Sequence, residues 1–269
     1  MTAEDLAGGK LLIDSPVESV VRLTLNRPEA RNALDHDLLD AITGKLGELA
    51  SDDQFRCLIL TGAGKGFSAG YDISGIPTDN FETDAEALVA HPFTAALEAI
   101  AEYRWPTIAA INGHALGGGL ELALTCDLRV CSTEARLGMP PAKLGLVYGH
   151  TGIQRFVDAI GIPATKELFL TGRTVDAEWA ERTGLINYLA PDGEVAELAT
   201  EVAVEIAGNA PLSVRGNKQA IEMLNSWPRL TPEQVEELIE LRKASFASED
   251  MREGVTAFAE KRKPEWKGR

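Results

Sequence analysis

The chain has 269 residues and 45% hydrophobic content, enough for one large domain with a sizeable core. Its formal net charge of −15 argues against nucleic acid or an anionic membrane surface as a partner, because both would repel it. Three cysteines without zinc-site spacing, no signal-like N-terminus and no long apolar run lead us to expect a cytoplasmic protein with no membrane span and no metal site.

The first part of the chain predicts strands around one helix. Strands are expected at 11–13 and 20–25, the second with the apolar and polar alternation of a half-buried strand, and a third strand is expected at 56–61. Between them, residues 38–50 place leucine and isoleucine at spacings of four, four and three, which predicts a helix with one buried face. Strands and helices therefore alternate, as in α/β proteins.

A glycine-rich turn, TGAGKGFSAG, follows the third strand at 61–70. It lacks the GK[ST] ending of a phosphate-binding loop. GFSAG does match the nucleophile-elbow pattern, but the residues after Ser68 contain glycine and proline and no helical stripe. We interpret the turn as a place where backbone approaches a ligand closely, with both motifs as weaker alternatives.

The most informative stretch is residues 106–127, PTIAAINGHALGGGLELALTCD. A polar segment at 75–92 and a helix at 93–104 precede it, and it begins with a strand at 107–111. Three consecutive glycines then lead into a short helix, where exposed backbone N–H groups and the helix dipole favour an anion. Glu121 lies in the first turn of that helix, so a carboxylate stands beside the place where negative charge would be held.

Short strands are expected at 128–131 and 136–138, before a break at two prolines. From residue 194 onward the pattern is helical, with helices at 194–207, 212–225 and 232–247. We therefore divide the chain into a core at 1–193 and an appended helical layer at 194–269.

Several motifs together resemble the crotonase (enoyl-CoA hydratase/isomerase) superfamily. They are spread over nearly the whole chain: NRPEARNAL at 26–34, LILTGAGKGFSAGYDI at 58–73, NGHALGGGLELALTCD at 112–127, LTGRTVDAEWAERTGLIN at 170–187 and EGVTAFAEKRKPEW at 253–266. The resemblance implies a spiral of strand–strand–helix repeats, with a C-terminal helical region that forms a homo-trimer or hexamer and closes over the active site. It also implies an acyl-CoA substrate.

The resemblance further assigns roles to individual residues. The N–H groups of Gly118 and Tyr71 would hold the thioester oxygen as it gains charge, and Glu121 would move a proton. Coenzyme A would be the substrate carrier, with no other cofactor, and its contacts would come from Arg31, Ala69, Asp72, Ile73 and Lys261. The alternative for Glu121 is a structural role, in which a carboxylate in the first turn of the helix only complements the helix dipole.

The chain departs from the hydratase pattern at two places. Hydratases carry a second glutamate twenty residues after the first, where this chain has Pro141, which cannot transfer a proton. The segment MPPAKLGLVYGHTGI at 139–153 is instead similar to the methylmalonyl-CoA decarboxylase branch, whose matching tyrosine, here Tyr148, lies at the substrate's carboxylate. That branch has histidine where this chain has Tyr71.

These departures leave the reaction and the acyl group open. We favour hydratase or isomerase chemistry on overall resemblance, with a carboxyacyl-CoA decarboxylase as the alternative and a non-catalytic acyl-CoA binder as an alternative of another class. His150 is a further acid–base candidate, because the ordinary pKa of histidine suits that role. Tyr148 could merely pack, and Asp127 is expected to be a hydrogen-bonded structural carboxylate.

Overall fold

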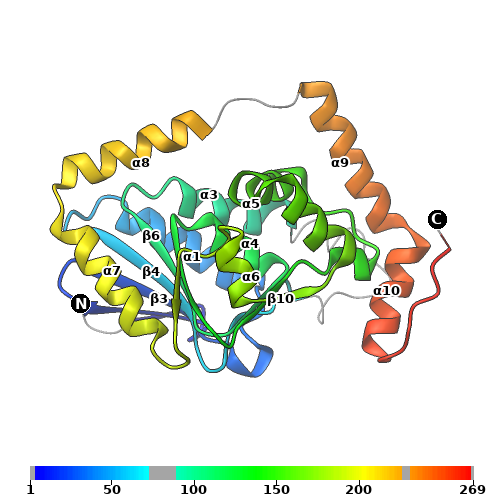
Figure 1. Cartoon of the computed structure of the whole chain (residues 1–269), viewed down its shortest axis with the longest axis horizontal. Coiled ribbons are helices and arrows are strands. Elements are labelled where there is room, and N and C mark those ends of the chain that lie inside the picture. Colours follow the sequence, from blue (N-terminus) through cyan, green and yellow to red (C-terminus); the bar gives the residue numbers. More distant parts are fainter. Residues whose placement is uncertain (1–3, 73–88, 226–230, 268–269) are drawn as a thin grey trace.

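Two β-sheets, of seven and four strands, form the centre of the fold in a computed structural model that describes residues 4–72, 89–225 and 231–267 (Figure 1). The large sheet has, in spatial order, β1 (Glu4–Leu6), β2 (Leu11–Val17), β3 (Val20–Leu25), β4 (Cys57–Gly62), β6 (Thr107–Ile111), β8 (Leu128–Ser132) and β11 (Tyr188–Ala190). The small sheet has β10 (Thr174–Asp176), β9 (Arg136–Gly138), β7 (His114–Leu116) and β5 (Gly66–Ser68).

Successive repeats of the chain contribute one strand to each sheet. β4, β6 and β8 are parallel neighbours in the large sheet, and the strands that follow them, β5, β7 and β9, are parallel neighbours in the small one. A helix follows β7 before the chain returns to the large sheet, and the same order is seen around α3. The predicted α/β spiral of strand–strand–helix repeats is therefore confirmed.

The helices surround these sheets. They are η1 (Pro28–Ala30), α1 (His36–Leu49), η3 (Val89–Phe93), α3 (Thr94–Ala101), α4 (Gly118–Thr125), η4 (Pro141–Leu144), α5 (His150–Thr171), α6 (Ala177–Arg182), α7 (Val195–Gly208), α8 (Pro211–Asn225), α9 (Pro232–Ala247) and α10 (Glu249–Ala259). None of the helices in the described ranges is long and apolar enough to cross a bilayer.

The alternation of side chains along the strands creates two cores. Leu58 and Leu60 of β4 point to one side, into the main core with helices α1, α3 and α4. Cys57 and Ile59 point to the other side, where the buried face of α7 covers the large sheet. The first helix after residue 194 thus packs directly on the strands.

All three cysteines, Cys57, Cys126 and Cys131, are free and buried. Burial raises the pKa of each thiol to about 12. At neutral pH they are therefore uncharged core side chains.

Some elements were not expected from the sequence. The 22-residue helix α5 was not predicted, because glycines at its start and Gly161 and Pro163 in its middle interrupt the apolar pattern. Gly161 has φ 72° and ψ 166°, so α5 is two helical segments joined at a kink. Of the predicted polar segment 75–92, residues 75–88 lie outside the described residues, and the rest begins a turn of π-helix that runs into α3.

The last three helices lie at opposite ends of the molecule (Figure 1). α8 lies on the α7 side, and α9 and α10 lie at the far end, where Gly254 packs against Leu144 of η4. α8 buries none of its residues but is held by Lys218, whose Nζ donates to Asp127 Oδ2 at 2.8 Å and to the carbonyl of Trp105 at 3.1 Å.

Asp127 is the structural carboxylate that the sequence predicts. Its Oδ2 also accepts hydrogen bonds from Thr107, from the backbone N–H at 2.6 Å and from the hydroxyl at 2.9 Å. It therefore joins the end of α4, the start of β6 and α8.

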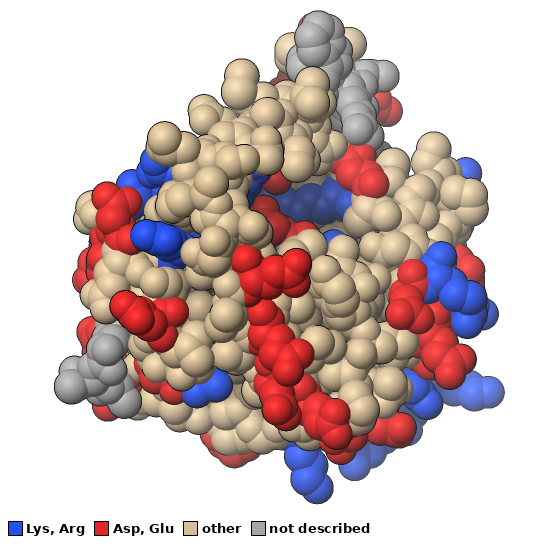
Figure 2. Space-filling view, turned by 60° about the vertical axis from the view of Figure 1, so that its left-hand side comes forward, with Lys and Arg blue, Asp and Glu red and all other residues tan. Residues whose placement is uncertain are grey.

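The surface on the α7 and α8 side is predominantly acidic where it is charged. Figure 2 shows a band of Asp and Glu side chains down the middle of this face, with Lys and Arg mostly towards its edges. This distribution fits the net charge of −15.

Candidate active site

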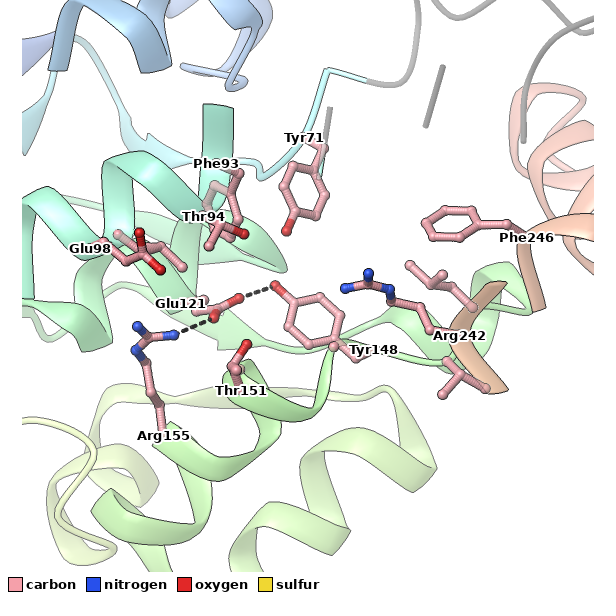
Figure 3. Close-up of a pocket in the computed structure, with 15 residues that line it drawn as sticks. Tyr71, Phe93, Thr94, Glu98, Glu121, Tyr148, Thr151, Arg155, Arg242 and Phe246 are labelled. Atoms are coloured by element: carbon pink, nitrogen blue, oxygen red, sulfur yellow. Dashed lines mark hydrogen bonds and ion pairs between the residues drawn. The ribbon is translucent and has the colours of Figure 1, made fainter. Parts of the chain in front are cut away.

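A pocket forms where α3, α4, α5 and α9 meet (Figure 3). Residues before and in α3 line one wall, the loop 146–149 and the start of α5 line another, and α9 contributes the remainder. The lining residues are Tyr71, Phe93, Thr94, Leu97, Glu98, Glu121, Leu146, Val147, Tyr148, Gly149, Thr151, Gly152, Arg155, Arg242 and Phe246.

Glu121 comes from the first turns of α4, and its side chain is the most buried carboxylate of this pocket. α4 begins at Gly118, after Gly117 has taken a conformation with φ 53° and ψ −127° that is accessible only to glycine. The Glu121 residue is only 3% exposed. A buried carboxylate requires hydrogen-bond or charge partners, because transfer of the ion out of water is costly.

The two partners of Glu121 come from the beginning of α5 and the loop before it. Tyr148 donates its hydroxyl to Oε2 at 2.5 Å, and Arg155 Nη1 lies 3.3 Å from Oε1 (Figure 3). Gly152 makes this approach possible, since a Cβ there would lie 2.7 Å from Tyr148 Cε1 and 2.8 Å from Glu121 Oε1.

The three groups influence one another's protonation. Burial raises the pKa of Glu121 above its ordinary 4.5, while the hydrogen bond from Tyr148 and the charge of Arg155 act in the opposite direction. Burial and the Glu121 charge hold the pKa values of Tyr71 and Tyr148 well above 10. Both phenols therefore remain protonated donors at neutral pH.

Tyr71 and Gly118 lie at the same edge of the small sheet. β5 and β7 are parallel, so the turns that follow them leave the sheet side by side. Gly70 marks the contact, since a Cβ there would lie 2.8 Å from the Leu116 carbonyl oxygen and 3.1 Å from the Gly118 nitrogen.

The backbone hydrogen bonds orient both N–H groups. Leu34 pairs with this turn through the Gly70 carbonyl and the Asp72 N–H, at 2.8 and 2.9 Å. In a parallel bridge of this kind, the N–H of the central residue, Tyr71, points away from Leu34. Gly118 is the first residue of α4, so its N–H precedes the helical hydrogen-bond ladder.

The residues expected to contact coenzyme A are partly brought together. Arg31 and Ala69 are exposed and adjacent, since the Ala69 N–H donates to the Arg31 carbonyl at 3.0 Å. Asp72 accepts from Arg27 Nη2 at 2.8 Å. Ile73 lies outside the described residues. Lys261 is exposed just after α10, and within the described ranges no hydrogen bond joins it to Arg31 or Ala69.

Two weaker candidates have other surroundings. The Ser68 hydroxyl is buried and donates a hydrogen bond to the Asn32 carbonyl at 2.8 Å. It therefore stabilises the turn and is not exposed as a nucleophile would be. His150, the first residue of α5, is not among the residues that line the pocket. Burial and the charge of Arg242 lower its pKa below 6.5. Pro141 is buried at the start of η4.

Sequence reasoning did not select Arg155, Arg242, Phe246 or Glu98 as site residues. Within α5, Thr151 and Arg155 are four residues apart and so share one face, but α5 itself was not predicted. The α3 and α9 residues carried no such signal, since their approach to Glu121 depends on how distant helices pack.

Comparisons with known proteins agree on one family. A family model described as enoyl-CoA hydratase/isomerase matches residues 16–269. The short-chain-enoyl-CoA hydratase of Clostridium acetobutylicum is 38% identical over 248 residues, covering 91% of this chain and 93% of the relative. The 2,3-dehydroadipyl-CoA hydratase of Escherichia coli is 34% identical over 258 residues, covering 96% and 99%.

Solved structures show the same relationship. A methylmalonyl-CoA decarboxylase in complex with 2-nitronate-propionyl-CoA superimposes with a TM-score of 0.88 at 27% identity, covering 97% of this chain and 99% of that one. The carnitinyl-CoA hydratase from Mycobacterium avium has a TM-score of 0.84 at 37% identity, with the same coverage.

The geometry predicts how Glu121 responds to loss of its cationic partner. In Arg155→Met, the pKa of Glu121 should rise further, because the charge that favours its ionised form is gone. Between pH 4.5 and the raised pKa, the folded chain binds more protons than the unfolded one, so this group makes stability fall as pH rises. Carboxyl ¹³C NMR titration measures the pKa, with Arg182→Met, on the exposed end of α6, as the control. An unchanged or lower Glu121 pKa in Arg155→Met would contradict the assignment.

Proposed function

This chain belongs to the enoyl-CoA hydratase/isomerase family, and we propose that it acts on an acyl-CoA thioester through an enolate held by the N–H groups of Gly118 and Tyr71. The observation that carries the proposal is the junction of the β5 and β7 turns beside the Glu121 carboxylate. Preorganised N–H donors stabilise developing negative charge without reorganisation. Coenzyme A is the substrate carrier, and no further cofactor is needed for this chemistry.

Glu121 is proposed to move the proton. Its raised pKa brings it closer to the range where a carboxyl can both accept and release a proton near neutral pH. Tyr148 and Arg155 would orient it and oppose the effect of burial. Isomerisation can use this single carboxylate to carry one proton between two carbons of the acyl chain.

Hydration needs a second proton-transfer group, because one proton is taken from water and another is given to carbon. Pro141 cannot supply it. Among the described residues that line the pocket, Glu98 on α3 is the second carboxylate, and His150 is not among them. We therefore propose Glu98 in place of His150 as the group that would support hydration. Hydratase or isomerase chemistry remains our first proposal.

Decarboxylation is the second candidate, favoured by Tyr148. Its hydroxyl points into the pocket beside Glu121, and the solved methylmalonyl-CoA decarboxylase has a TM-score of 0.88 with this chain. In such a reaction the bond between the α carbon and the carboxylate breaks, its electron pair forms the enolate, carbon dioxide leaves, and a proton is then added to the α carbon. No base is needed for the first step.

We also propose how the rest of the chain serves the site. Arg31, Ala69 and Asp72, with Ile73, would hold the adenine part of coenzyme A, and Lys261 its phosphates. Residues 1–193 would form the catalytic core and residues 194–269 the oligomerisation region. A cytoplasmic location is supported by the three free, buried thiols.

The oxyanion proposal predicts a specific loss in Gly118→Pro. Proline is tolerated at the first position of a helix but lacks the N–H. We expect affinity for acetoacetyl-CoA to fall by about tenfold to a hundredfold, the usual value of a hydrogen bond to a charged group. Gly118→Ala is the matched control, since it keeps the N–H and adds a Cβ 3.1 Å from Tyr71 Cζ. Equal binding by wild type and the proline variant would rule out this role of Gly118.

The reaction is decided by offering crotonyl-CoA, a 3-enoyl-CoA and methylmalonyl-CoA side by side. We expect isomerisation or decarboxylation to exceed hydration, and Glu121→Gln to abolish isomerisation. Hydration of crotonyl-CoA at about 10 s⁻¹ or more would show that Pro141 at the position of the second glutamate does not prevent efficient hydration. Glu98→Gln should then remove that hydration. Turnover of none of the three would leave the non-catalytic binder as the better account.

A homo-trimer or hexamer is proposed from the C-terminal helices. Leu212, Ile221, Met223 and Leu224 of α8 are between 63% and 83% exposed, more apolar surface than a monomer usually leaves on one helix. Light scattering at low micromolar concentration should give three or six times the chain mass of 28.9 kDa. A single species of 28.9 kDa, the mass of one chain, would contradict the proposed assembly.

A further inference from the structure

Two arginines line the pocket, although the chain as a whole is strongly acidic. Arg155 comes from α5 and Arg242 from α9, helices far apart in the sequence whose guanidinium groups both face the cavity (Figure 3). Both residues are partly buried, so their positive charge acts within the pocket.

The two arginines lie on different sides of the pocket. Arg155 faces Glu121 and Glu98, and it forms the ion pair with Glu121 at 3.3 Å (Figure 3). Arg242 lies beyond the Tyr148 ring, next to Phe246. The two carboxylates among the described lining residues are thus both on the Arg155 side, and the Arg242 side is the more positive end of the pocket.

The surroundings of Arg242 suit a carboxylate. The hydroxyls of Tyr71 and Tyr148 lie between Glu121 and Arg242 (Figure 3). The Tyr148 hydroxyl already donates to Glu121, whereas the Tyr71 hydroxyl, whose pKa is well above 10, is a protonated donor on the same side as Arg242. The charge of Arg242 is felt in the site, since it opposes the rise in the pKa of Tyr71. Leu146, Val147 and Phe246 supply an apolar wall, which strengthens a charge pair by excluding water.

We propose that Arg242 selects acyl-CoA substrates whose acyl group carries a free carboxylate in addition to the thioester, and that it binds this carboxylate together with the Tyr71 hydroxyl. This inference rests on the proposed function, because it assumes that the acyl group enters this pocket. It assigns Arg242 a specificity role that serves hydration, isomerisation and decarboxylation alike. The C-terminal region would thereby determine which acyl groups the core accepts.

The test compares the affinities of non-reacting acyl-CoA pairs in which a terminal methyl is replaced by a carboxylate: butyryl-CoA with succinyl-CoA, and pentanoyl-CoA with glutaryl-CoA. Isothermal titration should show tighter binding of the carboxylate member of at least one pair. Arg242→Gln should remove about tenfold to a hundredfold of that member's affinity, the usual loss for a charged hydrogen bond, and leave the neutral member unchanged. Arg242→Lys should retain part of the preference.

Lys243→Gln is the matched control, because Lys243 is the next residue on α9 and its exposed side chain pairs with Glu240. Free coenzyme A is measured as well. If Arg242→Gln weakens the binding of free coenzyme A, or of both members of each pair equally, the inference is wrong. Arg242 would then contact the coenzyme A phosphates or be needed for the folded structure. Equal binding of both members by wild type also overturns it but leaves the proposed function intact, whereas binding of no acyl-CoA at all would overturn the proposed function itself.

Discussion

Burial of one carboxylate constrains most of this site. Glu121 is 3% exposed, and an ionised carboxylate in such a place is costly without compensating donors. Its two donors come from a different part of the chain, which requires α5 to lie close against α4. Gly152 is the contact that permits this, because any side chain there would collide with both Tyr148 and Glu121. The position of α5 and the protonation of Glu121 are therefore two consequences of the same packing.

The second constraint is the parallel pairing of β5 and β7, which brings two turns of backbone together at one sheet edge. A Cβ at Gly119 would lie 2.6 Å from both the Cβ and the carbonyl oxygen of Ser68, so the start of α4 can approach β5 only as glycine. Ser68 in turn is fixed by its hydrogen bond to the Asn32 carbonyl. The resemblance of GFSAG to a nucleophile elbow thus reflects a shared need for a tight turn, with the serine used as a brace.

The electrostatics of the pocket follow from these two constraints and from α9. Near Glu121, the charge of Arg155 opposes the rise in the Glu121 pKa that burial causes. Across the Tyr148 ring, Arg242 gives the other end of the pocket a positive character. This polarity distinguishes the site from a simple apolar channel.

The sequence by itself determined the family, the α/β spiral and the position of Glu121, because these depend on local patterns: alternating strands, consecutive glycines and a carboxylate in the first turns of a helix. The resemblance to a known family also drew attention to Tyr148 and Pro141, and the effect of Pro141 on the reaction stays a prediction. The sequence did not predict α5, since Gly161 and Pro163 break the apolar period where the structure has a kink. Nor did it select Arg155, Glu98 or Arg242 for the site. Their distances from Glu121 are set by contacts between α3, α4, α5 and α9, which are remote in sequence. Which charged side chains of these helices face the same cavity depends on how the helices pack together. Residue spacing and composition do not specify the packing of helices that are distant in sequence, so only the tertiary structure decides it.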